Sequence, residues 1–275
     1  MPSILLHLLP ASMYAALGVH FWRSRWHEAT LAKRRGLSGW ERGALLLALA
    51  AHGLLLHREL FAAGGMRFGF SIAMSLMVWL AVLFYWIENL YARLDGLQTL
   101  AMPAASICSL LPGLFPIQHQ LPNADSPVFR AHFVVAMLAY SLFTLAALHA
   151  LLMSVAERQL HSARLSKALA NLPPLLTMET LLFRLISIAF VLLTLTLLSG
   201  IMFSEDLFGR AFILDHKTVF AIISWVIFGT LLAGRQIWGW RGKLAQRWTL
   251  VGFAVLLLAY VGSRFVMDVV LHRAV

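Results

Sequence analysis

Long runs of apolar residues alternate with short polar clusters along this chain, and the runs are continuous rather than broken at every second position. We distinguish eight such segments, at residues 3–22, 41–57, 68–88, 98–117, 131–155, 180–203, 216–235 and 248–271. A helix needs about 20 apolar residues to cross a hydrocarbon core about 30 Å thick, whereas membrane strands are shorter and alternate in polarity. The pattern predicts an all-α, polytopic transmembrane bundle of about eight helices, which forms a single integral membrane domain over 1–275.

The fourth segment departs from an uninterrupted membrane helix. It contains Pro103, Pro112 and Pro116. Proline removes a backbone donor and clashes with the preceding turn, so a helix that contains several prolines bends or ends early. We expect a broken or shortened helix here.

Composition supports a membrane protein. Apolar residues make up 60% of the chain, charged residues 12%, and the mean hydropathy is +0.79. Soluble domains carry about 25% charged and 45–50% apolar residues, so a water-soluble globular domain and a disordered chain are both excluded. The single cysteine, Cys108, lies in an apolar run and leaves no C-x-x-C pair or intrachain disulfide.

The net charge of +10 comes mainly from the loops. The odd-numbered connections hold fifteen lysines and arginines, and the even-numbered connections with the C-terminal tail hold six. Lysine and arginine mark cytoplasmic loops. We therefore expect the odd connections in the cytoplasm, both termini on the exterior side, and no nucleic-acid partner.

Several of the eleven histidines gather on the expected exterior side. His132 begins the fifth segment, His216 begins the seventh, and His272 follows the eighth, while His52 lies within the second. Two neutral imidazoles can supply both axial ligands of a haem iron. Aromatic side chains suit a porphyrin face and cations suit its propionates, and the same side offers Phe208, Phe212, Arg130, Arg210, Lys217 and Arg264.

Other chemistry has little support. The chain contains no H-E-x-x-H, G-x-S-x-G or Walker-type motif. Arg264 and Asp268 are four positions apart in the last segment, where they can neutralise each other. An ion or small-solute transporter that uses these two residues with His52 and His216 stays open as a weaker hypothesis.

The stretch from Phe208 onward resembles the membrane proteins of cytochrome c assembly, the CcsA/ResC/CcmC superfamily. The family carries an exterior W-G-x-x-W-x-W-D loop followed by P-K-E-T-W-A and L-I-T-W. The corresponding sequences here are F-G-R-A-F-I-L-D at 208–215, H-K-T-V-F-A at 216–221 and I-I-S-W at 222–225. The cytoplasmic G-W-R-G-K at 239–243 and the G-F-A at 252–254 continue the similarity.

The family's two exterior haem histidines also have counterparts. His132, with Tyr140 eight residues on, resembles the family's H-V…Y. His272 resembles the second exterior histidine, although its distance from Gly262 differs from the family spacing by about one residue. The resemblance covers 126–275, and the first four segments match mainly by layout. His52 corresponds in depth to a histidine that some members use within the membrane.

This chain also departs from the family pattern. Phe208, Phe212 and Leu214 replace the three tryptophans, and His216 replaces the proline after Asp215. Phenylalanine can pack on a porphyrin but lacks the indole N–H donor. The degenerate loop, and Leu172-Pro173-Pro174 with Glu179 before the sixth segment, resemble the YpjD or HemX-like branch.

The resemblance implies a haem-handling protein of the bacterial cytoplasmic (inner) membrane. Its periplasmic face would bind or present haem, with His132 and His272 as iron ligands. Expected contacts are the 203–217 loop, including Phe208, Phe212, Asp215 and His216, and the cations Arg210 and Lys217; His52 is a further candidate. Partners would be other membrane assembly proteins or an apocytochrome, and the role would be that of a chaperone, transporter or accessory protein rather than an enzyme. The alternative is a structural or regulatory membrane partner that kept the fold and lost haem.

Overall fold

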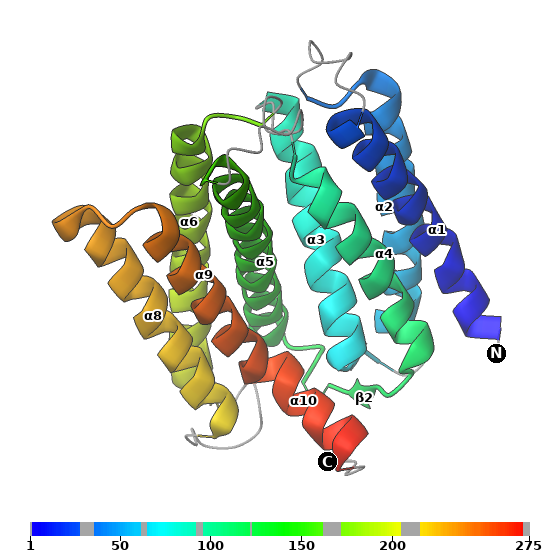
Figure 1. Ribbon diagram of the computed structural model, residues 1–275. Coiled ribbons are helices and arrows are strands. Elements are labelled where there is room, and N and C mark those ends of the chain that lie inside the picture. Colours follow the sequence, from blue (N-terminus) through cyan, green and yellow to red (C-terminus); the bar gives the residue numbers. More distant parts are fainter. Residues whose placement is uncertain are drawn as a thin grey trace.

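Each of the eight apolar segments forms a long helix in the computed structural model, which describes residues 2–27, 36–61, 65–91, 96–121, 123–161, 172–204 and 215–271 (Figure 1). In chain order these helices are α1 (Pro2–Trp22), α2 (Gly39–Leu60), α3 (Phe70–Tyr91), α4 (Gln98–Leu114), α5 (Pro127–His161), α6 (Leu175–Met202), α8 (His216–Trp238) and α9 (Gly242–Leu257). A π-helical turn, η1 (Arg23–His27), extends α1.

Among the described residues, seven helices are long and apolar enough to cross a membrane. The eighth, α4, has 17 residues and contains Pro103 and Pro112. It ends at Leu114, before Pro116, so the expectation of a shortened helix is confirmed. The ends of the other helices differ from the expected segments by a few residues. The differences include six residues at the end of α5, which reaches His161 rather than 155, and six at the start of α9, which begins at Gly242 rather than 248.

The last span changes helix type along its length. After α9 the chain continues through the π-helical turn η4 (Leu258–Gly262), the short α10 (Ser263–Phe265) and a second π-helical turn, η5 (Val266–Val270). Single π turns inside α-helices are found often at functional sites. Both turns lie toward the end of the bundle at which the described chain ends.

The helices form two groups that meet where α3 packs against α5. Figure 1 shows α1–α4 on one side and α5, α6, α8 and α9 on the other, with the N- and C-terminal ends of the described chain at the same end of the bundle. The C-terminal ends of α2, α4 and α6 also lie at this end, which we call the cavity end. The sequence did not predict the short antiparallel pair there, β1 (Arg67–Phe68) with β2 (His119–Gln120), in which Phe68 faces His119.

Buried aromatic side chains join the helices within the second group. Phe143 of α5 and Phe228 of α8 stack with ring centroids 3.9 Å apart, and both are fully buried. A Cβ placed at Gly252 of α9 would lie 2.9 Å from the Phe228 ring, so this glycine permits the close approach of α9. Close contact through small residues is a common way in which membrane helices associate.

The end opposite the cavity is held by Glu179 of α6. Its carboxylate accepts hydrogen bonds from Arg235 and from the backbone N–H of Gly242, and lies 3.2 Å from Arg241 Nε. Gly239 ends α8 with φ 67°, a left-handed conformation that favours glycine. Glu179 therefore fixes the turn formed by the G-W-R-G-K sequence.

Candidate functional site

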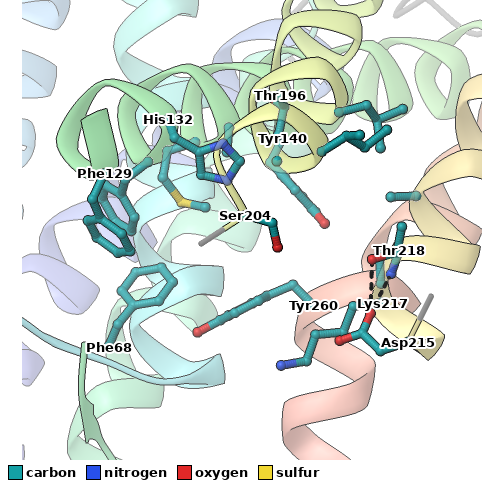
Figure 2. A pocket seen from close by; sticks show the side chains of 18 of the residues that line it. Phe68, Phe129, His132, Tyr140, Thr196, Ser204, Asp215, Lys217, Thr218 and Tyr260 are labelled. Atoms are coloured by element: carbon teal, nitrogen blue, oxygen red, sulfur yellow. Dashed lines mark hydrogen bonds between the residues drawn. The ribbon is translucent and has the colours of Figure 1, made fainter. Parts of the chain in front are cut away.

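A cavity of about 280 Å³ opens at the cavity end between the start of α5, the end of α6 and the start of α8. Phe68 of β1 and Tyr260 of η4 complete its wall. Figure 2 shows the His132 imidazole and the Tyr260 ring on opposite sides of this space, with Lys217 at its rim. The site therefore combines residues from both halves of the chain.

His132 is oriented by a hydrogen bond to α6. Its Nδ1 lies 2.8 Å from Ser199 Oγ, and Ser199 donates to the Thr196 carbonyl at 3.1 Å. A hydroxyl has one proton to donate, so when Ser199 gives it to Thr196, His132 Nδ1–H must be the donor to Ser199. The neutral imidazole then carries its lone pair on Nε2, which is the state that a metal ligand requires.

Aromatic side chains from one stripe of α5 form much of the wall. Phe129, His132, Phe133 and Tyr140 follow one another at helical spacing and all line the cavity. Phe133 lies edge-on to Phe68, with ring centroids 4.9 Å apart. The hydroxyl of Tyr140, a buried residue, points into the cavity (Figure 2). The wall suits a flat, mainly apolar ligand with a few polar edges.

Charged groups lie at the rim, where α8 begins. Asp215 caps α8 by accepting hydrogen bonds from the Thr218 N–H at 2.9 Å and the Thr218 hydroxyl at 3.0 Å. Burial by itself would raise the pKa of Asp215, but these hydrogen bonds and the nearby Lys217 and His216 together lower the pKa below its ordinary value. Because Lys217 lies in the first turn of α8, its ammonium and the helix N-terminus both favour an anionic group.

A ring of contacts supports the wall opposite His132. Phe68 packs against Tyr260 with ring centroids 5.4 Å apart, and Arg264 follows Tyr260 by four positions in the same span. Phe68 pairs in the strand ladder with His119, whose Nε2 lies 3.0 Å from Asp268 Oδ1. The sequence suggested that Asp268 neutralises Arg264, but the Asp268 carboxylate contacts the His119 imidazole instead, in a stretch where π turns replace the regular α-helical spacing.

The structure brings some of the predicted site residues together and separates others. His132, Asp215 and Lys217 line the cavity. His216 is the first residue of α8, as expected, but is exposed and does not line the cavity. His52 lies in α2 and contacts Ser75, away from these residues. The predicted residues Phe208, Arg210, Phe212 and His272 lie outside the described part of the chain.

A family model described as "Cytochrome C assembly protein" matches residues 42–271. The chain belongs to the cytochrome c assembly protein family. The match begins in α2, so similarity to the cytochrome c assembly proteins extends well beyond the 126–275 region that the motifs indicated. No solved structure matches.

Three relatives illustrate where the chain stands among cytochrome c assembly proteins. It is 28% identical over 241 residues to the inner membrane protein YpjD of Escherichia coli, a match that covers 84% of this chain and 89% of YpjD. It is 29% identical over 279 residues to a 28.8 kDa protein of Azospirillum brasilense, covering 98% and 96% of the two chains. The cytochrome c biogenesis protein CcsA of Prochlorococcus marinus is 38% identical over 88 residues, 32% of this chain and 28% of CcsA.

Several cavity residues were not singled out from the sequence. The stripe on α5 was visible in principle, because Phe129 and Phe133 share the helical spacing of His132 and Tyr140. Tyr260 also lies four positions before Arg264, which the sequence had singled out. Nothing in the sequence places Phe68 or Ser199 beside them, since those contacts depend on how separate segments pack.

Proposed function

We propose that this cytochrome c assembly family member binds or presents haem at the cavity end of the bundle. The observation that carries the proposal is His132, whose Nδ1 lies 2.8 Å from Ser199 Oγ, in an aromatic cavity that has Lys217 at its rim. Membership of the family supports a role connected with haem. The name of one relative, cytochrome c biogenesis protein CcsA, agrees with it.

The residues of the cavity fit a porphyrin in kind. Phe68, Phe129 and Phe133 would pack on its apolar faces, His132 would be an axial iron ligand, and Lys217 would pair with a propionate. The volume, about 280 Å³, is below the 300–1,000 Å³ typical of pockets for drug-sized ligands. We infer that the helices around the cavity separate when the ligand enters.

The second axial ligand in this proposal is His272. The residue before it, Leu271, follows η5 and is the last that the structure describes. Arg210, Phe208 and Phe212 would add contacts from the connection between α6 and α8. Bound haem would supply an iron porphyrin. Another protein would receive this haem or attach it covalently. The chain's own residues bind, orient and shield it, so the proposed role is that of a chaperone, transporter or accessory protein.

The proposed partners are an apocytochrome or other membrane assembly proteins. Attachment of haem through thioethers needs a pair of cysteines, and this chain has one cysteine, Cys108. A second protein must therefore supply that pair. Recovery of such a protein by crosslinking in native membranes, but not from a His132→Ala strain, would support presentation of haem rather than storage.

We place the protein in the bacterial inner membrane, with the cavity end in the periplasm. The name of the relative YpjD supports the membrane, and the lysine and arginine bias of the loops supports the orientation. A Cys108→Ala background allows a direct test with single cysteines at exposed positions. In intact spheroplasts an impermeant maleimide should label Asp125→Cys at the cavity end and spare Arg241→Cys at the other end. The reverse pattern would overturn the orientation.

The haem proposal is tested by the absorption spectrum of protein purified in mild detergent from haem-replete cells. We expect a Soret band with low-spin α and β bands in the wild type and its loss in His132→Ala and His272→Ala. His57→Ala is the matched control, because His57 is an exposed histidine of α2 outside the cavity. A haem-free wild type that forms no histidine-dependent spectrum with added haem would overturn the proposal.

A second candidate is a structural or regulatory membrane partner without haem. The observations that favour it are the small cavity and the replacement of the three loop tryptophans by Phe208, Phe212 and Leu214. In that case His132→Ala and His272→Ala would leave the cellular phenotype unchanged, while a tagged protein would still recover a specific membrane protein.

A further inference from the structure

A second group of buried polar side chains lies between α1 and α2, in the half of the bundle away from the His132 cavity. His7, Tyr14 and His52 are exposed by no more than 2% of their surface. Ionisable side chains inside a membrane are costly and usually mark a functional site, because the bilayer core offers no water to solvate them. His52 was a sequence candidate for the haem site, but it contacts Ser75 and does not line the cavity, and neither do His7 and Tyr14, so the haem proposal uses none of the three.

The two helices are antiparallel and place their polar residues opposite one another. His7 and Tyr14 are seven positions apart on α1, and His52 and Glu59 are seven positions apart on α2. His7 Nε2 lies 3.7 Å from Glu59 Oε1, and the Tyr14 and His52 rings meet edge-on with centroids 5.7 Å apart. The result is two polar layers about 10 Å apart along the helix axes.

Within the described part of the chain, three polar atoms in these layers have no hydrogen-bond partner. They are His7 Nδ1, the Tyr14 hydroxyl and His52 Nδ1, whereas His52 Nε2 lies 2.8 Å from Ser75 Oγ on α3. An unpaired buried donor or acceptor costs about 1–3 kcal/mol in proteins. A bridging water needs two to four polar partners, which these groups can supply.

The polar layers connect with solvent at the cavity end. Glu59 lies in the last turn of α2, its side chain is 28% exposed, and it accepts a hydrogen bond from Gln118 Nε2 at 2.7 Å. Toward the other end the next residues in the same register, Phe21 and Leu45, are apolar and fully buried. The polar Arg25–Glu41 pair, 3.1 Å apart, follows beyond them. The path from Glu59 to His52 is therefore open toward one end and closed toward the other.

We propose that His52 is a proton-accepting site inside the membrane that exchanges protons with the cavity end through His7 and Glu59. A proton taken from water at that end passes to the Glu59 carboxylate, then to His7, and along a short chain of bridging waters between the two layers to His52 Nδ1. The His52 imidazolium keeps its Nε2–H on Ser75 Oγ, and the Tyr14 hydroxyl donates to the last of these waters. His7 and Tyr14 precede residue 42, so the site depends on a helix outside the region that matches the family model.

The test follows the ring nitrogens of His52 by NMR in full-length protein labelled with ¹⁵N-histidine and reconstituted in lipid nanodiscs. His52→Gln assigns the signals. We expect the His52 ring signals to respond to pH. In Glu59→Gln the exchange of the His52 ring proton with water should slow by about tenfold, which corresponds to a barrier higher by about 1.4 kcal/mol. His7→Gln should give the same loss and carries the test if Glu59→Gln does not fold.

Two controls separate a proton path from general effects. Arg58→Gln removes an exposed charge beside Glu59 and should leave His52 exchange unchanged. His149, 3% exposed with its Nε2 on the Met178 carbonyl at 3.0 Å, is the internal reference for a sealed histidine. Exchange of His52 as slow as that of His149, or unchanged in both Glu59→Gln and His7→Gln, would overturn the proposal. None of these exchange measurements requires haem, so a failure of the proton-path proposal can be told from a failure of the haem proposal.

Discussion

His119 Nε2 lies 3.0 Å from Asp268 Oδ1, and this contact joins residues 149 positions apart. It connects strand β2 to the last turn of the final span. The Asp268 side chain is fully buried and that of His119 is 19% exposed. Since His119 is also the ladder partner of Phe68, the contact links the far end of the chain to the cavity wall.

Loss of this pair should destabilise the protein strongly. His119→Ala leaves the Asp268 carboxylate buried without its partner, a change that costs about 3–5 kcal/mol in buried pairs. We expect a clear fall in the melting temperature in detergent. Asp125→Asn is the control, because Asp125 pairs with Arg130 at the same end but is fully exposed. Equal melting temperatures for the two variants would contradict a supporting role for the buried pair.

Ser199 should control the affinity for haem without touching it. Ser199→Ala removes the acceptor of His132 Nδ1–H, so the imidazole loses its fixed tautomer and orientation. Loss of such a supporting contact typically lowers metal affinity about 10–100-fold. Titration with haem measures the change. Ser187→Ala, which removes a hydroxyl that donates to the Phe183 carbonyl of the same helix, should bind haem like the wild type.

Gly200 limits the size of the cavity. A Cβ at this position would lie 3.6 Å from His132 Cε1, an ordinary contact, so Gly200→Ala should be tolerated. Gly200→Leu would place a larger apolar group in the space beside His132 and should block the ligand while the protein stays folded. A leucine variant that binds haem as the wild type does would show that the ligand lies elsewhere.

Asp215 makes the stability of the α8 start depend on pH. Its pKa is lower in the folded protein than its ordinary value of 3.8, so its contribution is complete above that pH and is lost as pH falls through the folded value. Asp215→Ala should cost about 0.5–2 kcal/mol at neutral pH, the usual value of an N-cap. The difference in melting temperature between wild type and this variant should shrink below about pH 4.

Asp215→Asn is the companion to that experiment. Asparagine caps a helix as well as aspartate but carries no charge. Its stability relative to Asp215→Ala should stay constant from pH 7 to pH 3. A wild-type advantage that does not change with pH would show that the cap acts without its charge.

The sequence was sufficient to predict the helices but not the side-chain contacts between them. Membrane spans follow from apolar runs whose length is set by the bilayer, so the helices and the weakness of α4 could be predicted. The family motif led to His132, Asp215 and Lys217, which do share one cavity. Side-chain partners across helices have no such rule, and Ser199, Phe68 and Tyr260 were therefore missed.

Two motifs that were noted separately turn out to be one unit. Glu179 precedes the sixth segment's apolar core and G-W-R-G-K follows the seventh, 60 positions further on. In the structure the Glu179 carboxylate binds Arg235 and the Gly242 N–H. A buried carboxylate needs several donors, but sequence alone does not say which of the many arginines supplies them.

The two π turns of the final span bear on how this chain aligns with its relatives. A π turn holds one residue more than an α turn, so a chain can gain a residue there without breaking the helix. The one-residue difference in spacing between Gly262 and His272 falls in this stretch, where η5 follows α10. Deleting one residue from 266–270 should therefore restore an α turn and leave the rest of the span in its register. A relative with one residue fewer in this stretch would keep the same span as a regular α-helix.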